Sequence, residues 1–263
     1  MTNYTKEHAA YLRAIRIHRR AVSLSRIMVL ILLLSLWELG ARLGWFDVFI
    51  LSCPSRVLAA IERLWQEGSL FVHVGVTLYE TVMGFLLGTA LGILLAILLW
   101  WLPFVNEVID PYLVVLNALP KIALGPVLIV WIGAGMGSII VMAVLISLVV
   151  TTVTVLSGFN AAAEEKRFLM RTLGAGKGQI FLKVVLPAGV PHMMSALKIS
   201  VGMSWVGVIV GEYLVSRSGL GYLIVYGGQV FKLDLVMASV VILCLLAALM
   251  YGAVALLEKR FHS

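Results

Sequence analysis

Six long apolar runs dominate the sequence and limit the folds that it can adopt. Each run is 20 to 29 residues long and carries few charges, and about 20 mostly apolar residues are enough for a helix to cross a bilayer. The runs do not alternate apolar and polar residues as barrel strands do. Because helices satisfy their own backbone hydrogen bonds in lipid, we predict an all-α integral membrane bundle of about six transmembrane helices. The runs cover residues 27–46, 74–102, 111–134, 139–159, 192–214 and 235–257.

The composition supports a membrane protein and excludes several soluble classes. Hydrophobic residues make up 62% of the 263 residues and charged residues only 13%, whereas soluble domains contain about 45–50% apolar and about 25% charged residues. A soluble enzyme, a disordered regulator and a nucleic-acid-binding protein are therefore excluded. The chain contains only two cysteines, which also excludes a disulfide-linked scaffold and a metal centre built from cysteines.

The distribution of Lys and Arg predicts the orientation in the membrane. If the N-terminus is cytoplasmic, 13 of these residues fall on the cytoplasmic side and 4 on the opposite side, and cytoplasmic loops carry the excess of positive charge. We therefore expect both termini to be cytoplasmic. Residues 1–26 then form a basic tail and residues 27–260 one transmembrane domain. The net charge of +7 follows from this topology and requires no nucleic-acid partner.

A few charged residues interrupt the apolar runs and need an explanation, because an ionised side chain at the bilayer centre costs about 2.5–3.5 kcal/mol. Lys121 follows Pro120, and a broken helix of this kind belongs beside a cavity rather than against lipid. Lys198 lies near the start of the fifth run, where it either reaches the interface or lines a pathway. Glu80 and Glu212 lie near the outer ends of their runs, where we expect water to be close.

Three glycines of the second run, Gly84, Gly88 and Gly92, recur every four residues. This spacing places them on one face of a helix and allows another backbone to approach closely. The partner is either another helix of the same chain or a second subunit, and the sequence leaves both possibilities open.

The sequence contains no arrangement typical of catalysis or metal binding. The segment GAGKGQ at 174–179 resembles a phosphate-binding loop, but Arg171 and Gly178 stand where that motif requires Gly and then Ser or Thr. Ser204 has no histidine nearby that could act as its base, and the five histidines lack the spacing of metal ligands. We therefore expect neither enzymatic activity nor a bound metal.

The segment 160–191, between the fourth and fifth runs, is longer than a plain connection between two spans requires. Helix-forming stretches at 161–173 and 179–186 flank Gly174, and two prolines follow. The sequence therefore predicts a helix–turn–helix that ends before Pro187. Its five basic and two acidic side chains indicate a docking platform for a cytoplasmic partner.

Several ordered motifs support a family assignment. They are PS at 54–55, DP at 110–111, LPKIALGP at 119–126, WIGAG at 131–135, LGAGKGQIFLKVVLPAGVP at 173–191, LKISVGMSW at 197–205, VGVIVGE at 206–212 and SGLGYLI at 218–224. With these motifs in register over about residues 50–260, the sequence resembles the permease subunits of binding-protein-dependent ABC importers. The similarity is to the branch associated with nitrate, sulfonate and taurine.

The resemblance implies a membrane subunit that is not itself an enzyme and binds no cofactor. Such a permease pairs with a second permease copy, which we expect to be identical, with two ATPase subunits that bind ATP, and with a periplasmic or lipid-anchored binding protein. It implies ATP-driven uptake of a small solute, such as a sulfonate, taurine or nitrate, by alternating access across a bacterial inner membrane. The alternative is an ion-gradient-driven transporter, but neither midplane acidic residues nor inverted repeats are visible.

In this family the loop between the fourth and fifth spans inserts into a groove of the ATPase and transmits ATPase closure to the spans. The resemblance therefore implies a coupling role for five residues. Gly174 allows the tight turn, Leu173 and Ala175 bury against the ATPase, and Arg171 and Gln179 form hydrogen bonds across the joint.

The loop departs from the family pattern at 168–170, where Phe-Leu-Met stands in place of the usual Glu-Ala-Ala. Glu164 and Glu165 lie one turn upstream and are candidates to replace the missing glutamate in coupling to the ATPase. The apolar triplet instead suggests a more apolar docking surface.

Four residues are candidates for the solute pathway or its gate, namely Lys121, Lys198, Trp205 and Glu212. The two lysines suit an anion such as a sulfonate or nitrate. They could equally extend to the membrane interface.

Overall fold

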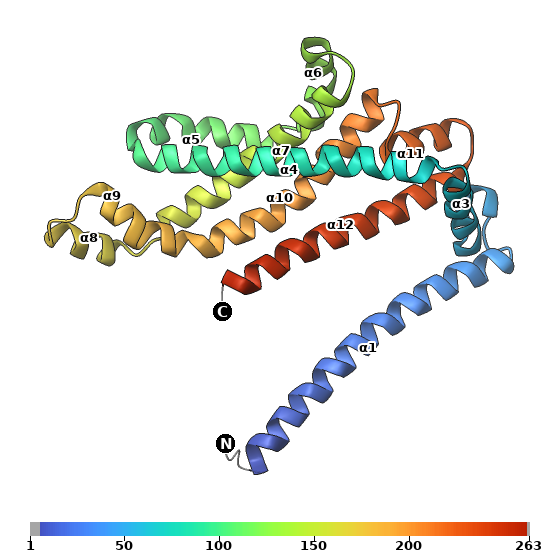
Figure 1. Ribbon diagram of the computed structural model, residues 1–263, viewed down its shortest axis with the longest axis horizontal. Coiled ribbons are helices and arrows are strands. Elements are labelled where there is room, and N and C mark those ends of the chain that lie inside the picture. Colours follow the sequence, from blue (N-terminus) through green and yellow to red (C-terminus); the bar gives the residue numbers. More distant parts are fainter. Residues whose placement is uncertain (1–5, 262–263) are drawn as a thin grey trace.

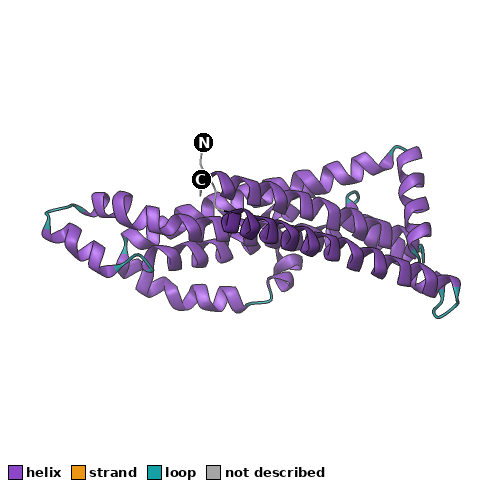
Figure 2. Ribbon diagram, turned by 90° about the horizontal axis from the view of Figure 1, so that it is seen from below, coloured by secondary structure: helices purple, strands orange, loops and turns teal. Residues whose placement is uncertain are grey.

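The computed structural model describes residues 6–261 and, within that range, every side chain except those of residues 6–10, 19, 121 and 261. This part of the chain folds into helices joined by short loops, with no strand (Figure 2), which confirms the predicted all-α fold. The elements are α1 (Lys6–Arg42), α2 (Val48–Leu51), α3 (Pro54–Gln66), α4 (Ser69–Trp101), α5 (Pro103–Ala118), the 3-10 turn η1 (Lys121–Leu124), α6 (Gly125–Ile132), α7 (Met136–Asn160), α8 (Glu164–Thr172), α9 (Lys177–Ile180), the π turn η2 (Phe181–Val185), α10 (Leu186–Val215), α11 (Leu220–Gln229) and α12 (Leu233–Phe261).

Within the described range, five helical segments are long and apolar enough to cross a membrane, and they contain α1, α4, α7, α10 and α12. A sixth candidate is the pair α5 and α6, which is bent by 88°, so the predicted run 111–134 is not one helix. The bend lies at Leu119, which has extended backbone angles (φ −60°, ψ 135°). A residue before a proline avoids the helical region, and Pro120 itself has no N–H to donate.

The fifth span begins earlier than predicted, because its prolines do not interrupt it. Lys177–Val215 form one helical segment of 39 residues, which consists of α9, η2 and α10. The π turn Phe181–Val185 ends two residues before Pro187. Its wider i→i+5 hydrogen-bonding pattern relieves the conflict between the proline ring and the preceding turn. The predicted end of the second loop helix before Pro187 is therefore wrong, since this helix continues into the span.

α7 lies in the middle of the bundle and packs against α4 and α10 (Figure 1). The three glycines of α4 all face α7. A Cβ atom on Gly84 would lie 2.5 Å from Ala143 Cβ, and one on Gly92 would lie 2.7 Å from Thr151 Cβ, while Gly88 lies between them on the same face. The glycine stripe is therefore a close contact between two helices of this chain.

α1 runs beside the bundle rather than within it (Figure 1). Residues 21–36 are all exposed, although most of them are apolar, and α1 contacts mainly α3. At this contact the Glu38 carboxylate accepts a hydrogen bond from the Ser55 N–H at 3.1 Å. A membrane-length helix thus keeps apolar surface that the described part of the chain does not cover.

The bundle has two ends with different elements. The loop end carries α8 and α9, and the α3–α11 end carries α2, α3 and α11 (Figure 1). α1 begins and α12 ends in the half of the molecule nearer the loop end. This placement agrees with a topology in which both termini and the α8–α9 loop share one side of the membrane.

Candidate functional site

The turn between α8 and α9 has the geometry of a helix end closed by glycine. Gly174 has a φ of +78°, in the left-handed region that glycine adopts most readily. Its N–H donates to Arg171 O at 3.0 Å, and the Ala175 N–H donates to Met170 O at 2.9 Å. The last carbonyls of α8 are thereby satisfied, and the tight turn lies at the residue to which the sequence assigned it.

α8 buries none of its residues and exposes three large apolar side chains. Phe168 is 67% exposed, Leu169 58% and Leu173 73%. Leu169 and Leu173 are four residues apart and therefore lie on one side of the helical turn. We call these three residues the loop apolar patch. Exposed apolar side chains grouped in this way indicate a contact with another molecule.

Two of the predicted coupling residues make contacts within the chain itself. Ala175 is half-buried and packs against the core cluster between the ends of α4, α7 and α10, so it is less available to a partner than predicted. Gln179 accepts a hydrogen bond from the Gly176 N–H at 3.0 Å through Oε1, which stabilises the turn. The other polar coupling candidates are exposed on α8, namely Glu164, Glu165 and Arg171.

Lys177 fastens the start of α9 to the end of α4. Its Nζ donates to Trp101 O at 2.6 Å and lies 5.7 Å and 5.6 Å from the ring centroids of Trp100 and Trp101, within the range of a cation–π contact. The Phe181 ring packs on Trp100 with 4.9 Å between centroids. Sequence reasoning missed this attachment, because Lys177 and Trp101 are 76 residues apart and no local pattern joins them.

Glu80 of α4 and Glu212 of α10 form a buried carboxyl cluster at the α3–α11 end. Each is only 1% exposed, so the expectation that water lies close to them was wrong. Thr77 Oγ1 donates to Glu212 Oε1 at 2.6 Å, and the Gly221 N–H donates to Oε2 at 2.5 Å. The two carboxyl groups also lie within hydrogen-bonding reach of each other.

The carboxyl cluster holds the loop that leads into α11. The Leu220 N–H donates to Thr77 Oγ1 at 2.8 Å, and the Gly219 N–H donates to His73 Nδ1 at 3.0 Å. A Cβ atom on Gly221 would lie 2.7 Å from Glu212 Oε2. Gly221 therefore leaves space for the Glu212 carboxyl group beside the backbone. The spacing of the motif at 218–224 did not reveal this contact.

The predicted pathway residues of α10 face other helices of their own chain. Successive members of the series Lys198, Trp205 and Glu212 are seven residues apart, so all three lie on nearly one face of the helix. Lys198 Nζ forms an ion pair with Glu258 of α12 at 2.5 Å, and Trp205 is buried between α4 and α12. The role of these residues in lining a pathway stays a prediction. The side chain of Lys121 lies outside the described residues.

Two ion pairs lie near the α3–α11 end. Asp234 accepts a hydrogen bond from Ser52 Oγ at 2.7 Å and forms an ion pair with Arg56 at 3.0 Å. Glu38 and Arg42 form an ion pair at 2.9 Å. Among the side chains that the structure describes, His, Cys, Asp and Glu form no group of three that could hold a metal ion.

Comparison with known proteins identifies the family. Residues 88–263 match the family described as "Binding-protein-dependent transport system inner membrane component". The chain belongs to this family. The permease is 34% identical over 242 residues to a probable ABC transporter permease protein of Haemophilus influenzae, a match that covers 90% of this chain and 96% of the relative.

Two further relatives carry substrate names. The permease is 28% identical to a putative aliphatic sulfonates transport permease protein of Bacillus subtilis, over 87% of this chain and 83% of the relative. It is 30% identical to a formylaminopyrimidine transport permease protein of Halalkalibacterium halodurans, over 90% of this chain and 94% of the relative. The sulfonate relative agrees with the branch that the motifs indicated.

The fold of the permease also matches solved structures. A chain of the inward-facing MetNI methionine ABC transporter superposes with a TM-score of 0.63 at 19% identity, over 72% of this chain and 94% of that chain. This similarity concerns the fold alone. Together with the family match, it confirms the resemblance that the sequence motifs indicated.

Proposed function

We propose that the permease is the transmembrane subunit of an ABC importer and that its α8–α9 loop binds an ATPase subunit. The loop apolar patch carries this proposal. Its three side chains are exposed on a helix whose turn is held to the bundle by Lys177. A surface that is apolar, exposed and fixed in place is stabilised when a partner covers it. Because the patch includes Phe168 and Leu169 from the Phe-Leu-Met triplet, we expect ATPase binding to depend mainly on apolar contact.

The loop connects directly to the helix that would transmit movement. α9 continues through η2 into α10, so Lys177–Val215 form one segment of 39 residues. Near its far end, Glu212 holds the start of α11 through the Gly221 N–H. A tilt imposed on the loop by ATP-driven closure of the ATPase pair would therefore reach the opposite end of the bundle along a single helix, which supports alternating access.

The proposed importer contains two identical permease copies and two ATPase subunits. The exposed apolar surface of α1 supports a second copy, because membrane helices associate through packing. The excess of 13 Lys and Arg over 4 supports an inner-membrane orientation in which the loop end and both termini are cytoplasmic.

The α3–α11 end is the proposed contact for a periplasmic or lipid-anchored binding protein. An open cavity of about 480 Å³ lies there, lined by Arg56, Arg63 and Lys232 and by the aromatic rings of Tyr222 and Tyr226. Arginine and tyrosine are enriched in protein–protein interfaces. The same cavity is also lined by Glu67 and Asp234, so this surface suits a partner patch that carries charges of both signs.

The proposed solute is a small organic molecule, such as a sulfonate or taurine, or nitrate. The sulfonate relative supports this class, and the formylaminopyrimidine relative extends it to other small nutrients. Membership of this family does not favour the ion-gradient-driven alternative. In proteoliposomes that contain permease, ATPase and binding protein, we expect uptake of a labelled sulfonate to require ATP. Uptake driven by an ion gradient without ATP would contradict the proposal.

ATPase binding is tested by co-purification of the full-length permease with its ATPase from detergent. We expect Leu173→Asp to abolish capture, because it places a charge in the apolar patch. The matched control is Leu58→Asp on α3, a leucine that is similarly exposed (67% against 73%) but lies at the other end. Equal capture of the ATPase by wild type and Leu173→Asp would overturn the coupling role of the loop.

A further inference from the structure

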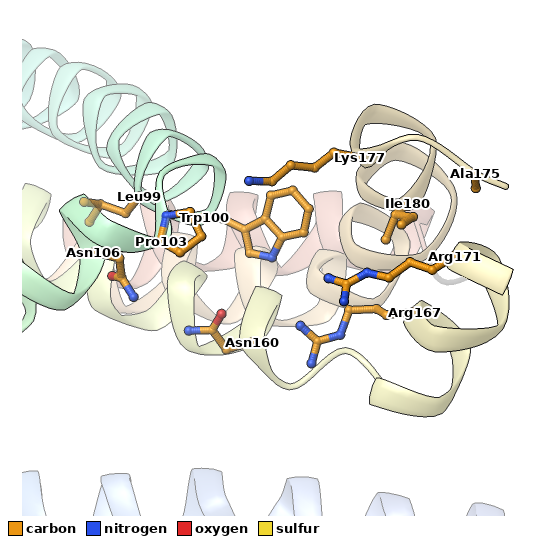
Figure 3. A pocket seen from close by; sticks show the side chains of 10 residues that line it. All are labelled: Leu99, Trp100, Pro103, Asn106, Asn160, Arg167, Arg171, Ala175, Lys177 and Ile180. Atoms are coloured by element: carbon orange, nitrogen blue, oxygen red, sulfur yellow. The ribbon is translucent and has the colours of Figure 1, made fainter.

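A cavity of about 390 Å³ separates the α8–α9 loop from the ends of the membrane helices (Figure 3). Its walls come from the end of α4 at Trp100, the start of α5 at Pro103, the end of α7 at Asn160, and from α8 and α9. Elements from three separate parts of the sequence, namely α4 with α5, the end of α7, and α8 with α9, therefore meet around one partly open space. The proposed binding of an ATPase to the exposed side of α8 does not account for this space.

The cavity is lined by cations and by no carboxylate. Arg167 and Arg171 line it from α8, and Lys177 lines it from α9. In Figure 3 the two guanidinium groups extend from α8 in the same direction, toward Asn160. Like charges four residues apart on a helix repel each other, and within the described part of the chain neither arginine forms an ion pair. The lining therefore concentrates positive charge. The nearest carboxylates on α8, those of Glu164 and Glu165, share a neighbouring cavity with both arginines but form no ion pair with either of them.

Two polar atoms at the cavity are buried without a hydrogen-bond partner among the described residues, namely Arg167 Nε and Asn106 Oδ1. Buried polar groups in folded proteins are nearly always hydrogen-bonded, and an unpartnered charged donor is especially unfavourable. A ligand with anionic oxygens would satisfy Arg167 Nε. A hydroxyl group of the ligand, or a water molecule bound with it, would satisfy Asn106.

We propose that this cavity binds the phosphate group of an anionic ligand and thereby stiffens the coupling loop. Arg167 and Arg171 provide guanidinium forks that match the oxygens of a phosphate in a bidentate manner, and Lys177 adds a third positive charge. α5 is 16 residues long and begins in the cavity wall, so its first N–H groups and the positive end of its dipole also favour an anion. A bound phosphate joins α8 to the ends of α4, α5 and α7.

Two sources supply the same chemistry, the headgroup of an anionic phospholipid and free inorganic phosphate. Trp100 and Trp101 stand at the end of a membrane helix, where tryptophan is enriched at the lipid interface. Basic pockets between membrane helices on the cytoplasmic side bind anionic lipid headgroups. The site lies entirely within the permease, so the test of anion binding needs no ATPase. A negative result in this test would leave the proposed transport function standing.

The test uses full-length permease in nanodiscs of phosphatidylcholine alone, with added inorganic phosphate, or with added phosphatidylglycerol. Hydrogen exchange of residues 161–180 reports loop stiffening, and native mass spectrometry reports the bound anion. The test variant is Arg167→Gln/Arg171→Gln. The matched control is Lys166→Gln/Lys183→Gln, which removes two positive charges from exposed positions of the same region that do not line the cavity.

We expect one or both anions to slow hydrogen exchange in the wild type and in the lysine control. The arginine variant should bind about tenfold more weakly or worse, since each charge-assisted hydrogen bond contributes about one factor of ten. The Arg167→Lys variant keeps the positive charge but loses the guanidinium fork, so it should bind the anion with intermediate affinity. This variant keeps the test decisive if the double arginine variant does not fold.

The pattern of protection distinguishes the sources of phosphate. Protection by phosphatidylglycerol alone identifies a lipid site, and protection by inorganic phosphate alone identifies a soluble anion site. Protection by both supports a site that accepts either source. The proposal is overturned if neither anion protects the loop, or if the arginine variants bind as tightly as the lysine control.

Discussion

The buried carboxyl cluster at the α3–α11 end and the arginines at the loop end differ in whether they find partners within the chain. At the α3–α11 end, Glu80 and Glu212 are buried, and Glu212 accepts hydrogen bonds from Thr77 and the Gly221 N–H of the same chain. At the loop end, Arg167 and Arg171 form no ion pair in the described part of the chain, and the loop apolar patch is exposed. Glu212 therefore finds its partners within the chain, whereas the two arginines and the loop apolar patch find no such partners in the described part of the chain. Substitutions should therefore reduce stability at the first end and binding at the second.

Among the changes that truncate a side chain, the largest loss of stability is expected from Glu212→Ala. This change leaves Thr77, the Gly221 N–H and Glu80 without their buried partner, and we expect the free energy of unfolding to fall by about 3 kcal/mol. Thermal unfolding in detergent measures it. Glu212→Gln keeps a group that both donates and accepts, so it should lose less. A Glu212→Ala protein as stable as the wild type would remove the distinction between the two ends.

A smaller loss is expected from Gly84→Ala, which acts on the core between the two ends. The new Cβ would lie 2.5 Å from Ala143 Cβ, and overpacking of this kind lowers stability by about 1–3 kcal/mol. The matched control is Gly202→Ala on α10, where nothing lies within 4 Å of an added Cβ. If both variants unfold at the same temperature, α4 and α7 do not pack as closely as the glycine stripe indicates.

Lys177→Ala should loosen the loop without unfolding the bundle. It removes one hydrogen bond and the cation–π contacts to two tryptophans, which together contribute about 1 kcal/mol at a site of this exposure. We expect faster hydrogen exchange at residues 173–181 and an unfolding temperature close to that of the wild type. Lys183→Ala, which has neither contact, should leave exchange unchanged. Identical exchange in both variants would argue that Lys177 does not hold the loop.

The smallest effect on stability is expected from Leu173→Asp. Its side chain is 73% exposed, and exposed substitutions usually change stability by less than about 0.5 kcal/mol. The same change at Leu220, which is fully buried at the α3–α11 end, should prevent folding. The yield and monodispersity of the two purified variants measure how much each change disturbs folding. Equal damage by both changes would show that the loop end is packed within the chain after all.

Features that depend on neighbouring residues were predictable from the sequence. The apolar runs indicated helices, because a single segment in lipid must satisfy its own backbone. The break near Pro120 followed from the missing N–H of proline, and the turn at Gly174 from the conformational freedom of glycine. The motifs also indicated the family, since they are read in order along the chain.

Features that depend on distant residues were not predictable in this way. The continuation of α9 into α10 depends on a π turn ahead of Pro187, which no local pattern announces. Whether the glycines of α4 meet another helix of the same chain or another subunit was open until α7 was found against them. The sequence left open whether Lys198 reaches the interface or lines a pathway, and only the packed helices place it beside Glu258 of α12.

By itself, therefore, the sequence determined that the chain is a helical membrane permease, where most of its spans lie and where its loop turns. Only the tertiary structure decided that Glu80 and Glu212 share a buried cluster and that Arg167 and Arg171 face one cavity. The physical reason is the range of the interactions. Backbone hydrogen bonds and hydrophobic length act within a segment, whereas Thr77 and Glu212 are 135 residues apart and meet only after the helices have packed.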